Sequence, residues 1–497
     1  MTGGVLQLVS VGVENLYLTN DPQITFFKVV YRRHTNFSIE SMPQFFNIKP
    51  DFSNRVSCSI AKNGDLINRI YVVVTLPSIP TLPSNVVARW VNNIGFVLLK
   101  TVEIEIGGKV IDRHYSEWLY IWNELNKTNN RRGLDIMTGN VDELIKFNKS
   151  INAYQLYIPL QFWFCRNQAL SLPIIALEHS EVKINVEFND LEKCIIAGPS
   201  HTIYLNDCIN LFKPYELLQI NGTDSYVQFI NFDNTTLKMS YLKVDDTVSL
   251  KIGDVLIGVE SGYSTNIYDP NSKLYTTIKI NNEVLYLTKS NTNFRSIYNL
   301  TISDAFLYID YVYLDNMERI KFARSDHEYL IDYCQFDNEK NIYNSNNKIK
   351  IGYSHPTKEI IIRAQLNNMI GSFSSDPFNF TTSLNPSYKK SLIKKSVLRL
   401  NGFIREEAYD KNFYTYVQSY QHHKSIAPLG LFLYSFSLNP TEHQPSGSCN
   451  FSKIDDISLD VTVEPITYNN PANVKVYAIT LNVLRILNGV AGLAFDN

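Results

Sequence analysis

Short segments in which apolar and polar residues alternate, bounded by turn residues, recur along this chain and restrict its fold more than any other feature. In KTVEIEIGGKVIDR, residues 100–113, valine and isoleucine alternate with Glu103 and Glu105, and the segment then turns at Gly107 and Gly108. A period of two residues is typical of a strand with one apolar and one solvated face. The segment therefore predicts a β-hairpin whose glutamate side is solvated, and the pattern as a whole predicts an all-β protein.

A second hairpin, SVLRLNGFIREE at 396–407, turns at Asn401 and Gly402, residue types that tolerate the positive φ angles of a tight turn. Each hairpin leads into an aromatic stretch, HYSEWLYIWNEL after the first and AYDKNFYTYVQSY after the second. Two further pairs of segments keep the same order along the chain: 69–77 resembles 359–366, and 181–188 resembles 456–463. We therefore predict an internal duplication, with two similar all-β units in tandem.

The boundary between the two units is predicted from the segments that follow LYIDYVYLD, which has the composition of a strand. Asp315 and Glu318 have the spacing of a helix start, and NMERIKFARSDHEYLIDY is predicted to continue that helix. The polar stretch 337–348 is predicted to be a linker or loop. We expect the first unit to span 1–334 and the second to span 335–497.

Residues 197–300 have no counterpart in the second half of the chain. An ordered insertion of this length needs secondary structure of its own, because structureless loops longer than about 15 residues are uncommon. We expect a β-rich elaboration of the first unit that faces outward.

Composition limits the function. Charged residues make up only 19% of the 497 residues and aromatic residues 12%, which suggests that a partner covers much of the surface. The formal net charge is −2 and basic residues are not clustered, so direct binding of nucleic acid is disfavoured. The six cysteines form no C-x-x-C pair and are expected to be reduced, buried thiols. A secretion signal and a membrane-spanning segment are not expected.

The stretch NPTEHQPSGSCNFSKIDD, residues 439–456, contains the residue types of nucleophilic hydrolysis. It lacks a G-x-S-x-G elbow, and no helix start is evident beside Ser448 or Cys449 to activate them. Prolines and a glycine enforce turns, and Ser452 with Asp455 has the spacing of a local cap. We expect a rigid structural or interface loop without catalytic residues, formed by Asn439, Pro440, His443, Gln444, Pro445, Ser446, Gly447, Asn450 and Asp455.

No metal or cofactor site is predicted. The nine histidines include one adjacent pair, His422 and His423, and no H-x-H or H-E-x-x-H pattern. That pair is expected at a surface or an interface. No glycine-rich phosphate loop is present either.

Both ends of the chain are apolar. VLQLVSVGVENLYL could form a short amphipathic helix, and because it lacks a basic face we expect it to lie on a neighbouring subunit rather than on a membrane. VYAITLNVLRILNGVAGLAFDN is expected to end the chain as a last strand and a packed terminus.

Five parts of the chain together resemble the major capsid proteins of the nucleocytoplasmic large DNA viruses, the double jelly-roll family: 3–40, 162–188, 310–331, 354–362 and 398–456. The last part is similar to that family's NP-x-x-HQPSG-x-CNFS-x-ID signature. The resemblance implies two tandem eight-stranded jelly rolls with a few short helices, the insertion lying in a loop of the first. The resemblance implies that this signature serves loop geometry and trimer packing.

The resemblance also implies a function. Members of the family form homotrimers in which six jelly rolls give a pseudo-hexagonal capsomer, and many capsomers tile an icosahedral shell. The partners implied are other copies of the chain, minor capsid and vertex proteins, and an inner membrane beneath the shell. The implied location is the virion, with assembly in the host cytoplasm at viral factories.

Two alternative functions stay open at this point. A scaffolding protein that shapes an immature membrane could have the same fold. A jelly roll can also be a carbohydrate-binding module or an enzyme, with aromatic loops that hold sugars.

Overall fold

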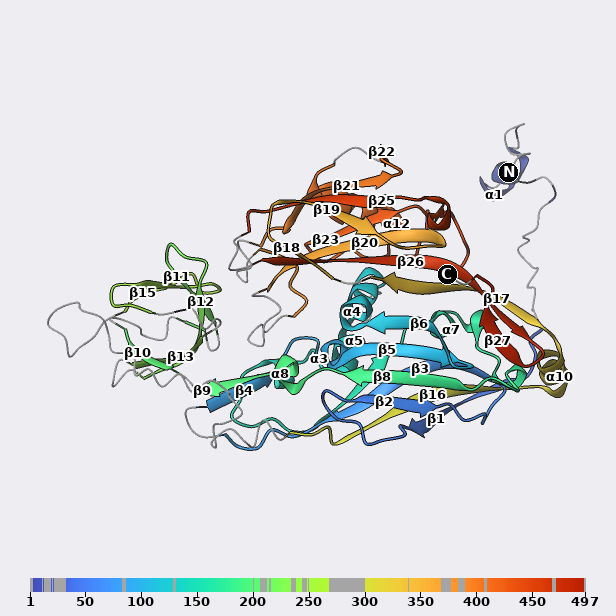
Figure 1. The fold of residues 1–497 in the computed structure, drawn as a ribbon, viewed down its shortest axis with the longest axis horizontal. Helices are drawn as coiled ribbons and strands as arrows, with labels where there is room; N and C mark the ends of the chain where they lie inside the picture. Colours follow the sequence, from blue (N-terminus) through green and yellow to red (C-terminus); the bar gives the residue numbers. More distant parts are fainter. Residues whose placement is uncertain are drawn as a thin grey trace.

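The structure is a computed structural model in which two β-sandwiches are stacked and a small separate β-sheet lies at one end (Figure 1). It describes residues 3–10, 12, 19, 21, 33–82, 86–127, 131–199, 201–205, 212–213, 216–233, 238–243, 248, 250–267, 300–337, 339–367, 377–382, 389–405, 409–466 and 471–495.

The first sandwich consists of two four-stranded antiparallel sheets. One sheet has the order β1 (Phe37–Phe45), β16 (Asp304–Leu314), β3 (Leu66–Leu76) and β7 (Tyr154–Pro159). The facing sheet has the order β2 (Arg55–Ser59), β8 (Val182–Phe188), β5 (Leu99–Ile106) and β6 (Lys109–Tyr115).

The second sandwich repeats this arrangement. Its first sheet has the order β17 (His327–Phe336), β26 (Ala472–Leu487), β20 (Pro356–Leu366) and β23 (Leu431–Ser435). Its facing sheet has the order β19 (Asn346–Ile351), β25 (Ile457–Val463), β21 (Ile393–Leu400) and β22 (Phe403–Ile404). Three short strands extend the second sandwich: β18 (Lys340–Ile342), β24 (Cys449–Asn450) and β27 (Val490–Leu493).

The two sandwiches have the same topology, which supports the predicted duplication. The segment pairs matched by sequence occupy equivalent places: β3 and β20 are each third in the first sheet, and β8 and β25 are each second in the facing sheet. The hairpins β5–β6 and β21–β22 are also equivalent. With eight strands per sandwich in this order, each sandwich is a jelly roll, and the predicted fold class is confirmed.

Both hairpin turns consist of residues with positive φ angles, a backbone conformation that few L-residues adopt. Gly107 and Gly108 have φ angles of 59° and 84° between β5 and β6, and Asn401 and Gly402 have 49° and 81° between β21 and β22. The side of β5 that was predicted to be solvated is not solvated throughout. Glu103 is buried, because Arg55 and Arg113 lie across its carboxylate at 2.5 and 2.6 Å.

The described part of the insertion is a six-stranded sheet with its own hydrophobic core at the end of the molecule opposite α10 (Asn316–Arg324) (Figure 1). The sheet order is β10 (His201–Tyr204), β13 (Lys238–Lys243), β12 (Tyr226–Asp233), β11 (Leu217–Ile220), β14 (Val255–Gly258) and β15 (Ser264–Asn266). A two-stranded ladder precedes it, formed by β4 (Val86–Trp90) and β9 (Ile195–Pro199).

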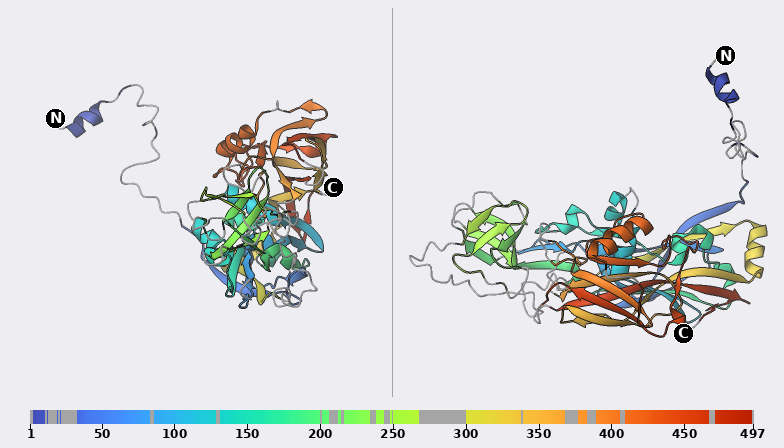
Figure 2. Two further views of the ribbon diagram at one scale, coloured as in Figure 1. Left: turned by 90° about the vertical axis from the view of Figure 1, so that its left-hand side faces the viewer. Right: turned by 90° about the horizontal axis from the view of Figure 1, so that it is seen from above.

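The helices are short and, apart from α1 before the first strand, lie in the connections between strands (Figure 2). None of the helices within the described ranges is long and apolar enough to cross a membrane. They are α1 (Gly3–Val9), α3 (Ile94–Leu98), α4 (Ser116–Leu125), α5 (Arg131–Thr138), α6 (Asp142–Ile145), α7 (Trp163–Arg166), α8 (Leu191–Cys194), α10, η5 (Phe413–Val417) and α12 (Gln418–His422), with short 3₁₀ turns η1 (Gln168–Leu170), η2 (Ile174–Ala176) and η6 (Phe451–Lys453).

Two predictions around the boundary were wrong. Asp315 caps α10 as expected by accepting a hydrogen bond from the Asn316 backbone, but the helix ends at Arg324. DHEYLIDY forms most of β17, because its backbone pairs with β26 from His327 to Phe336 and this ladder outweighs local helical preference. The predicted linker also contains strand residues, those of β18 and the start of β19. The expected boundary near residue 335 stays a prediction.

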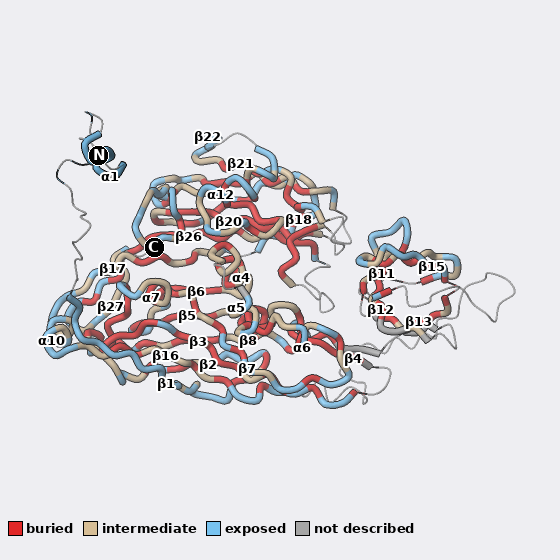
Figure 3. The backbone as a smooth tube through the Cα atoms, turned by 180° about the vertical axis from the view of Figure 1, so that it is seen from behind, coloured by how far each residue is buried: buried red, intermediate tan, exposed pale blue. Residues whose placement is uncertain are grey.

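The two ends of the chain differ. The C-terminal segment forms strand β26, most of which is buried, so the predicted last strand is confirmed (Figure 3). The predicted packed terminus is packed only in part, because Val490 of β27 and Phe495 are more than half exposed. The N-terminal segment contains α1, whose apolar residues are exposed and which lies away from both sandwiches (Figure 2). Most of the remainder of the predicted amphipathic helix lies outside the described residues.

Candidate functional site

The two sandwiches are joined by a buried junction in which β6 and α4 of the first contact β17, β26 and β20 of the second (Figure 1). One hydrophobic cluster runs through it, containing most of the first sandwich's core together with Ile361, Leu433, Tyr477 and Ile479 of the second. The junction therefore holds the two sandwiches as one body.

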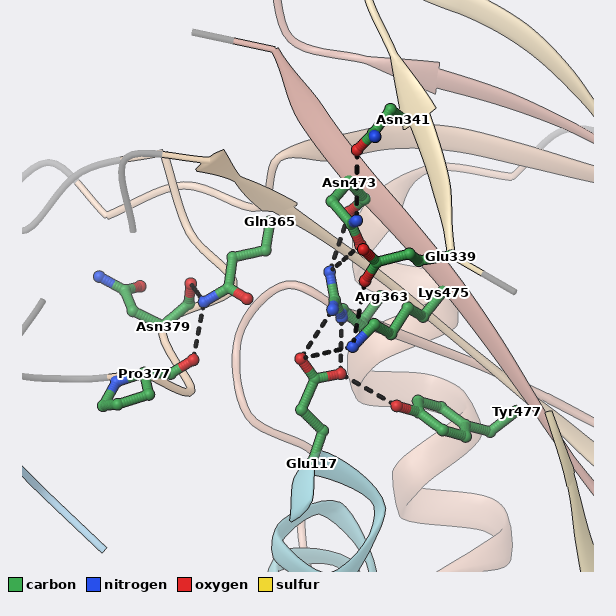
Figure 4. A network of polar contacts seen from close by, with 10 residues as sticks. All are labelled: Glu117, Glu339, Asn341, Arg363, Gln365, Pro377, Asn379, Asn473, Lys475 and Tyr477. Atoms are coloured by element: carbon green, nitrogen blue, oxygen red, sulfur yellow. Dashed lines mark hydrogen bonds and ion pairs between the residues drawn. The ribbon is translucent and has the colours of Figure 1, made fainter. Parts of the chain in front are cut away.

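Glu117 is the polar centre of the junction. It lies in the first turn of α4 and points into the second sandwich (Figure 4). Arg363 on β20 binds its carboxylate in bidentate fashion, with Nε to Oε2 at 2.9 Å and Nη2 to Oε1 at 2.7 Å. On β26, Lys475 donates to Oε1 at 3.3 Å and Tyr477 donates to Oε2 at 3.0 Å. Four polar contacts thus converge on one carboxylate, which offsets part of the cost of burying it.

The third guanidinium nitrogen of Arg363 donates hydrogen bonds within the second sandwich. Its Nη1 donates to the backbone oxygen and to Oδ1 of Asn473 at 3.0 and 2.9 Å. These two bonds hold the guanidinium in the orientation in which it binds Glu117, and a planar guanidinium held in this way loses less conformational entropy per hydrogen bond.

The acid dependence of stability should reflect this network. Burial alone would raise the pKa of Glu117, but Arg363 and Lys475 lower it from 4.5 to about 2. A carboxylate whose folded-state pKa is depressed stabilises the fold above its unfolded pKa, and that contribution is lost as the pH falls through the folded pKa. We expect the free energy of unfolding to decrease between about pH 4.5 and pH 2, measured by urea unfolding. In Glu117→Gln this decrease should be smaller; an identical acid dependence in both proteins would contradict the role of Glu117.

A second group of contacts lies on β6. Asp112 accepts a hydrogen bond from the backbone nitrogen of Cys334 on β17 at 3.1 Å, and its other oxygen contacts Nε2 of His114 at 2.9 Å. Tyr115 packs against Phe336 and Tyr477, with ring centroids 4.7 and 6.2 Å apart. On this side of the junction, β6 is joined to the second sandwich by a side-chain hydrogen bond to the β17 backbone and by aromatic packing.

The loop 439–456 is attached to the junction through Lys358. This lysine lies on β20, is fully buried, and donates to Asp332 Oδ2 at 3.2 Å and to the backbone oxygen of Glu442 at 2.7 Å. Burial lowers the pKa of Lys358, and Asp332 opposes that shift. Arg166 of the first sandwich donates to the backbone oxygen of Asp332 at 3.1 Å and stacks 4.5 Å from the Trp122 ring centroid. The loop and both sandwiches therefore meet at one group of charges.

A cavity of about 430 Å³ opens beside these charges. Its walls come from both sandwiches and from the loop, and they include Trp122, Arg166, Asp332, Glu442 and His443. His443 is half-buried in this wall, and among the described residues no hydrogen bond joins its ring to a nucleophile.

The loop itself is organised by local hydrogen bonds. Ser446 Oγ contacts Ser437 Oγ at 2.7 Å and accepts from the backbone nitrogen of Asn439 at 2.9 Å. Asn450 caps η6 by accepting from the Ser452 nitrogen, so the predicted cap formed by Ser452 and Asp455 was wrong. Ser452 Oγ instead accepts from the His355 backbone nitrogen at 2.7 Å, which ties the loop to the start of β20. Of the other predicted residues, Pro440 is buried, while Gln444, Pro445 and Asp455 are exposed.

Gly447 is required by the loop backbone. Its φ is 134°, and a Cβ at this position would lie 2.6 Å from the backbone oxygen of Phe436. We expect Gly447→Ala to lower stability by about 1 to 3 kcal/mol through backbone strain, measured as a lower unfolding midpoint in urea. Gly108→Ala is the matched control, because φ is also positive there but a Cβ would meet no atom within 4 Å. Equal effects of the two substitutions would mean that the contact with Phe436 is unimportant.

The described residues form no hydrolytic or metal centre. Ser448 is exposed, and burial raises the pKa of the Cys449 thiol, which keeps it protonated. No group of three or more histidine, cysteine, aspartate or glutamate residues could hold a metal within the described ranges. Cys58, Cys165, Cys194, Cys334 and Cys449 are free thiols.

The expectation that the His422–His423 pair lies at a surface or interface was wrong for the His423 side chain. That side chain is fully buried, and its Nε2 lies 2.6 Å from Glu359 Oε1 on β20. His422 is half-buried, with Nδ1 2.9 Å from the backbone oxygen of Leu438. The pair contributes to the packing between α12 and the second sandwich.

Sequence reasoning missed the junction network. Arg363 lies within EIIIRAQL, residues 359–366, which the sequence matched to 69–77 as one copy of the duplication, and Lys358 directly precedes that segment. Charged residues in an otherwise apolar strand are a signal of a buried partner, since such residues are rarely buried unpaired.

The fold and this site define a class of protein, a tandem jelly roll. Among the described residues, the polar groups around Glu117 and Lys358 join the two β-sandwiches and do not form a site for a substrate. Comparison with known proteins is consistent with that class. Residues 25–233 match the family model of the major capsid protein N-terminus, and residues 318–492 match that of the large eukaryotic DNA virus major capsid protein.

Whole-length relatives support the family assignment. The chain is 40% identical over 517 residues to probable capsid protein 4 of Acanthamoeba polyphaga mimivirus, with 100% of both chains covered. It is 32% identical over 609 residues to the major capsid protein of Phaeocystis pouchetii virus, again with 100% of both covered. The chain belongs to the family of major capsid proteins of large eukaryotic DNA viruses. Its function is that of a structural component of the virion shell, and it is not an enzyme.

Solved structures share the fold. The quasi-atomic model of the PBCV-1 virus capsid is 25% identical with a TM-score of 0.62, covering 95% of this chain and 100% of that one. The Faustovirus major capsid protein is 12% identical with a TM-score of 0.67, covering 96% and 94%. The second likeness concerns the fold alone.

Proposed function

We propose that this major capsid protein acts as a homotrimer, in which six jelly rolls form a pseudo-hexagonal capsomer that tiles an icosahedral shell. The observation that carries the proposal is the repeated topology. Each chain contributes two equivalent sandwiches held rigidly together, so three chains supply six similar units for a closed ring.

The division of the chain follows from the same proposal. The proposed first jelly roll is 1–334 with the insertion near 197–300, and the proposed second is 335–497. β17 (His327–Phe336) crosses this boundary, and because it pairs with β26 its residues before 335 also contribute to the second sandwich. The insertion has its own core at one end of the molecule, which supports a position on the outside of the capsomer (Figure 1). The loop 439–456 serves to fix the junction and to pack within the capsomer.

Further partners also belong to the proposal. Minor capsid and vertex proteins bind between capsomers, and a membrane lies beneath the shell. Assembly takes place at viral factories in the host cytoplasm. The low charged fraction, 19% of residues, supports an extensively covered surface.

The test is the mass of the purified full-length protein by light scattering at neutral pH, with negative-stain images of the same fraction. We expect three times the chain mass of 57.1 kDa and a three-cornered outline. A well-folded monomer would overturn the trimer. The protein should also be abundant in purified mature virions; its presence only in immature particles would favour the scaffolding function instead.

A further inference from the structure

The outward side of β1 in the first sandwich is mostly apolar and is exposed among the described residues, with the hydrogen-bonded pair Ser41 and Asp310 in its middle. On β1, the side chains of Ile39 and Phe45 are 47% and 67% exposed, and Phe37 and Pro43 of the same face are exposed as well. Phe45 packs against Phe306 on β16, with ring centroids 5.8 Å apart. We call this surface, formed by Phe37, Ile39, Pro43, Phe45, Phe306 and Tyr308, the β1 face.

The equivalent face of the second sandwich is covered within the chain. Along that face, Phe336, Tyr477 and Ile361 pair in one row of β17, β26 and β20. The matching row on the β1 face is Pro43, Tyr308 and Tyr71.

The two rows are matched in two steps. Because β3 is equivalent to β20, Tyr71 takes the place of Ile361, and the strand registers then place Tyr308 and Pro43 beside Tyr71. In the second sandwich, Tyr115 at the end of β6 packs on Phe336 and Tyr477. The row on the first sandwich also contains two aromatic residues, Tyr308 and Tyr71, and within the described ranges no aromatic ring from another sandwich packs on them in this way.

The surface that would cover the β1 face is present on the second sandwich. Phe403 and Ile404 on β22, the equivalent of β6, are 79% and 53% exposed. When Gly402 is aligned with Gly108, Tyr409 takes the position of Tyr115, and it is exposed too. We call Phe403, Ile404 and Tyr409 the β22 edge. It lies on the opposite side of the molecule from β1 (Figure 1).

From these equivalences we infer that the β22 edge of one copy docks on the β1 face of the next, repeating between chains the contact that β6 makes with β17 within the chain. Tyr409 of one copy then meets Pro43 and Tyr308 of its neighbour. The inference rests on the proposed trimer and states which surfaces close it. Because the two surfaces differ and lie on opposite sides, the contact is head to tail, and such contacts close into a ring when the rotation fits.

The contact between copies differs in chemistry from the junction within the chain. Val73 and Phe306 take the places of Arg363 and Lys475, as the paired registers show. The ion network around Glu117 is therefore not repeated, and aromatic side chains supply the contact. Aromatic residues are enriched at the energetic centres of protein interfaces, which suits this replacement.

Three double variants test the inference by light scattering. Phe45→Asp with Tyr308→Asp alters the β1 face, and Phe403→Asp with Tyr409→Asp alters the β22 edge. Tyr263→Asp with Met317→Asp is the control, since both residues are exposed outside these surfaces. We expect both surface variants to fall from three times to one times the chain mass and the control to stay trimeric.

Mixing tests the head-to-tail arrangement. The β1-face variant keeps an intact β22 edge, and the β22-edge variant keeps an intact β1 face. An equimolar mixture should therefore form one intact contact and give a species of twice the chain mass. A mixture that stays at one chain mass would overturn the head-to-tail contact.

A measurement on the unaltered protein covers the case in which a variant does not fold. Hydroxyl-radical footprinting of the native trimer should show Phe45, Phe403 and Tyr409 strongly protected relative to Tyr263. If the native protein is a trimer in which these residues react as readily as Tyr263, the inference fails while the proposed trimer stands. If the native protein is a monomer, the proposed function itself fails.

Discussion

Replacing Glu117 by alanine is expected to lower the free energy of unfolding by about 3 to 5 kcal/mol. The substitution leaves Arg363 and Lys475 without their shared carboxylate, and the Arg363 side chain is only 1% exposed. A buried cation without a partner cannot regain its hydration, so the loss exceeds the value of the contact itself. Urea unfolding at a fixed protein concentration measures the change, since subunit association contributes to stability.

The control for this prediction is an ion pair at the surface. Asp142 and Lys146 lie one helical turn apart with their charges 2.6 Å apart and both side chains mostly exposed. Asp142→Ala should therefore change stability by no more than about 0.5 kcal/mol. If Glu117→Ala behaved like Asp142→Ala, the junction would not depend on this network.

The second large effect is expected for Lys358→Ala. Asp332 Oδ2 would lose its hydrogen-bond donor and keep only the more distant Arg166 Nη1 at 3.9 Å, and Oδ1 already has no hydrogen-bond partner among the described residues. The backbone oxygen of Glu442 would lose its donor as well. We expect a loss of at least about 3 kcal/mol, together with faster hydrogen exchange in the loop 439–456.

Lys424 provides the comparison for Lys358. It pairs with the Glu442 carboxylate at 3.1 Å, but both side chains are more than half exposed. Lys424→Ala should leave the exchange rates of the loop close to those of the unaltered protein. Accelerated exchange in both variants would show that the loop depends on surface charge rather than on the buried lysine.

The junction within the chain and the proposed contact between copies cover equivalent sheet faces with different chemistry. The two sandwiches have equivalent sheet faces: that of the second is covered inside the chain, and in the proposed contact that of the first is covered by a neighbour. Inside the chain a buried ion pair is tolerated because the partners fold together. Between copies the face uses aromatic side chains such as Tyr308, which can stay exposed before assembly at little cost.

The amino-acid sequence by itself determined the strands and their duplication. Alternation in KTVEIEIGGKVIDR and SVLRLNGFIREE predicts hairpins from local geometry alone, and the order of matched segments predicts two similar units. The loop 439–456 could be assigned to turn chemistry for the same reason, because the conformation of Gly447 and the hydrogen bonds of Ser446 involve nearby residues of the chain.

The tertiary structure alone decided what lies on each outward sheet face. Alternation separates the two faces of a strand, but it does not say whether an outward residue meets water, another sandwich or another copy. Glu103 was therefore expected in solvent although two arginines cover it, and Arg363 gave no sign that its partner was Glu117, 246 residues away. DHEYLIDY was assigned to a helix for a related reason: pairing with β26 depends on a strand at the far end of the chain, and local preference contains no information about it.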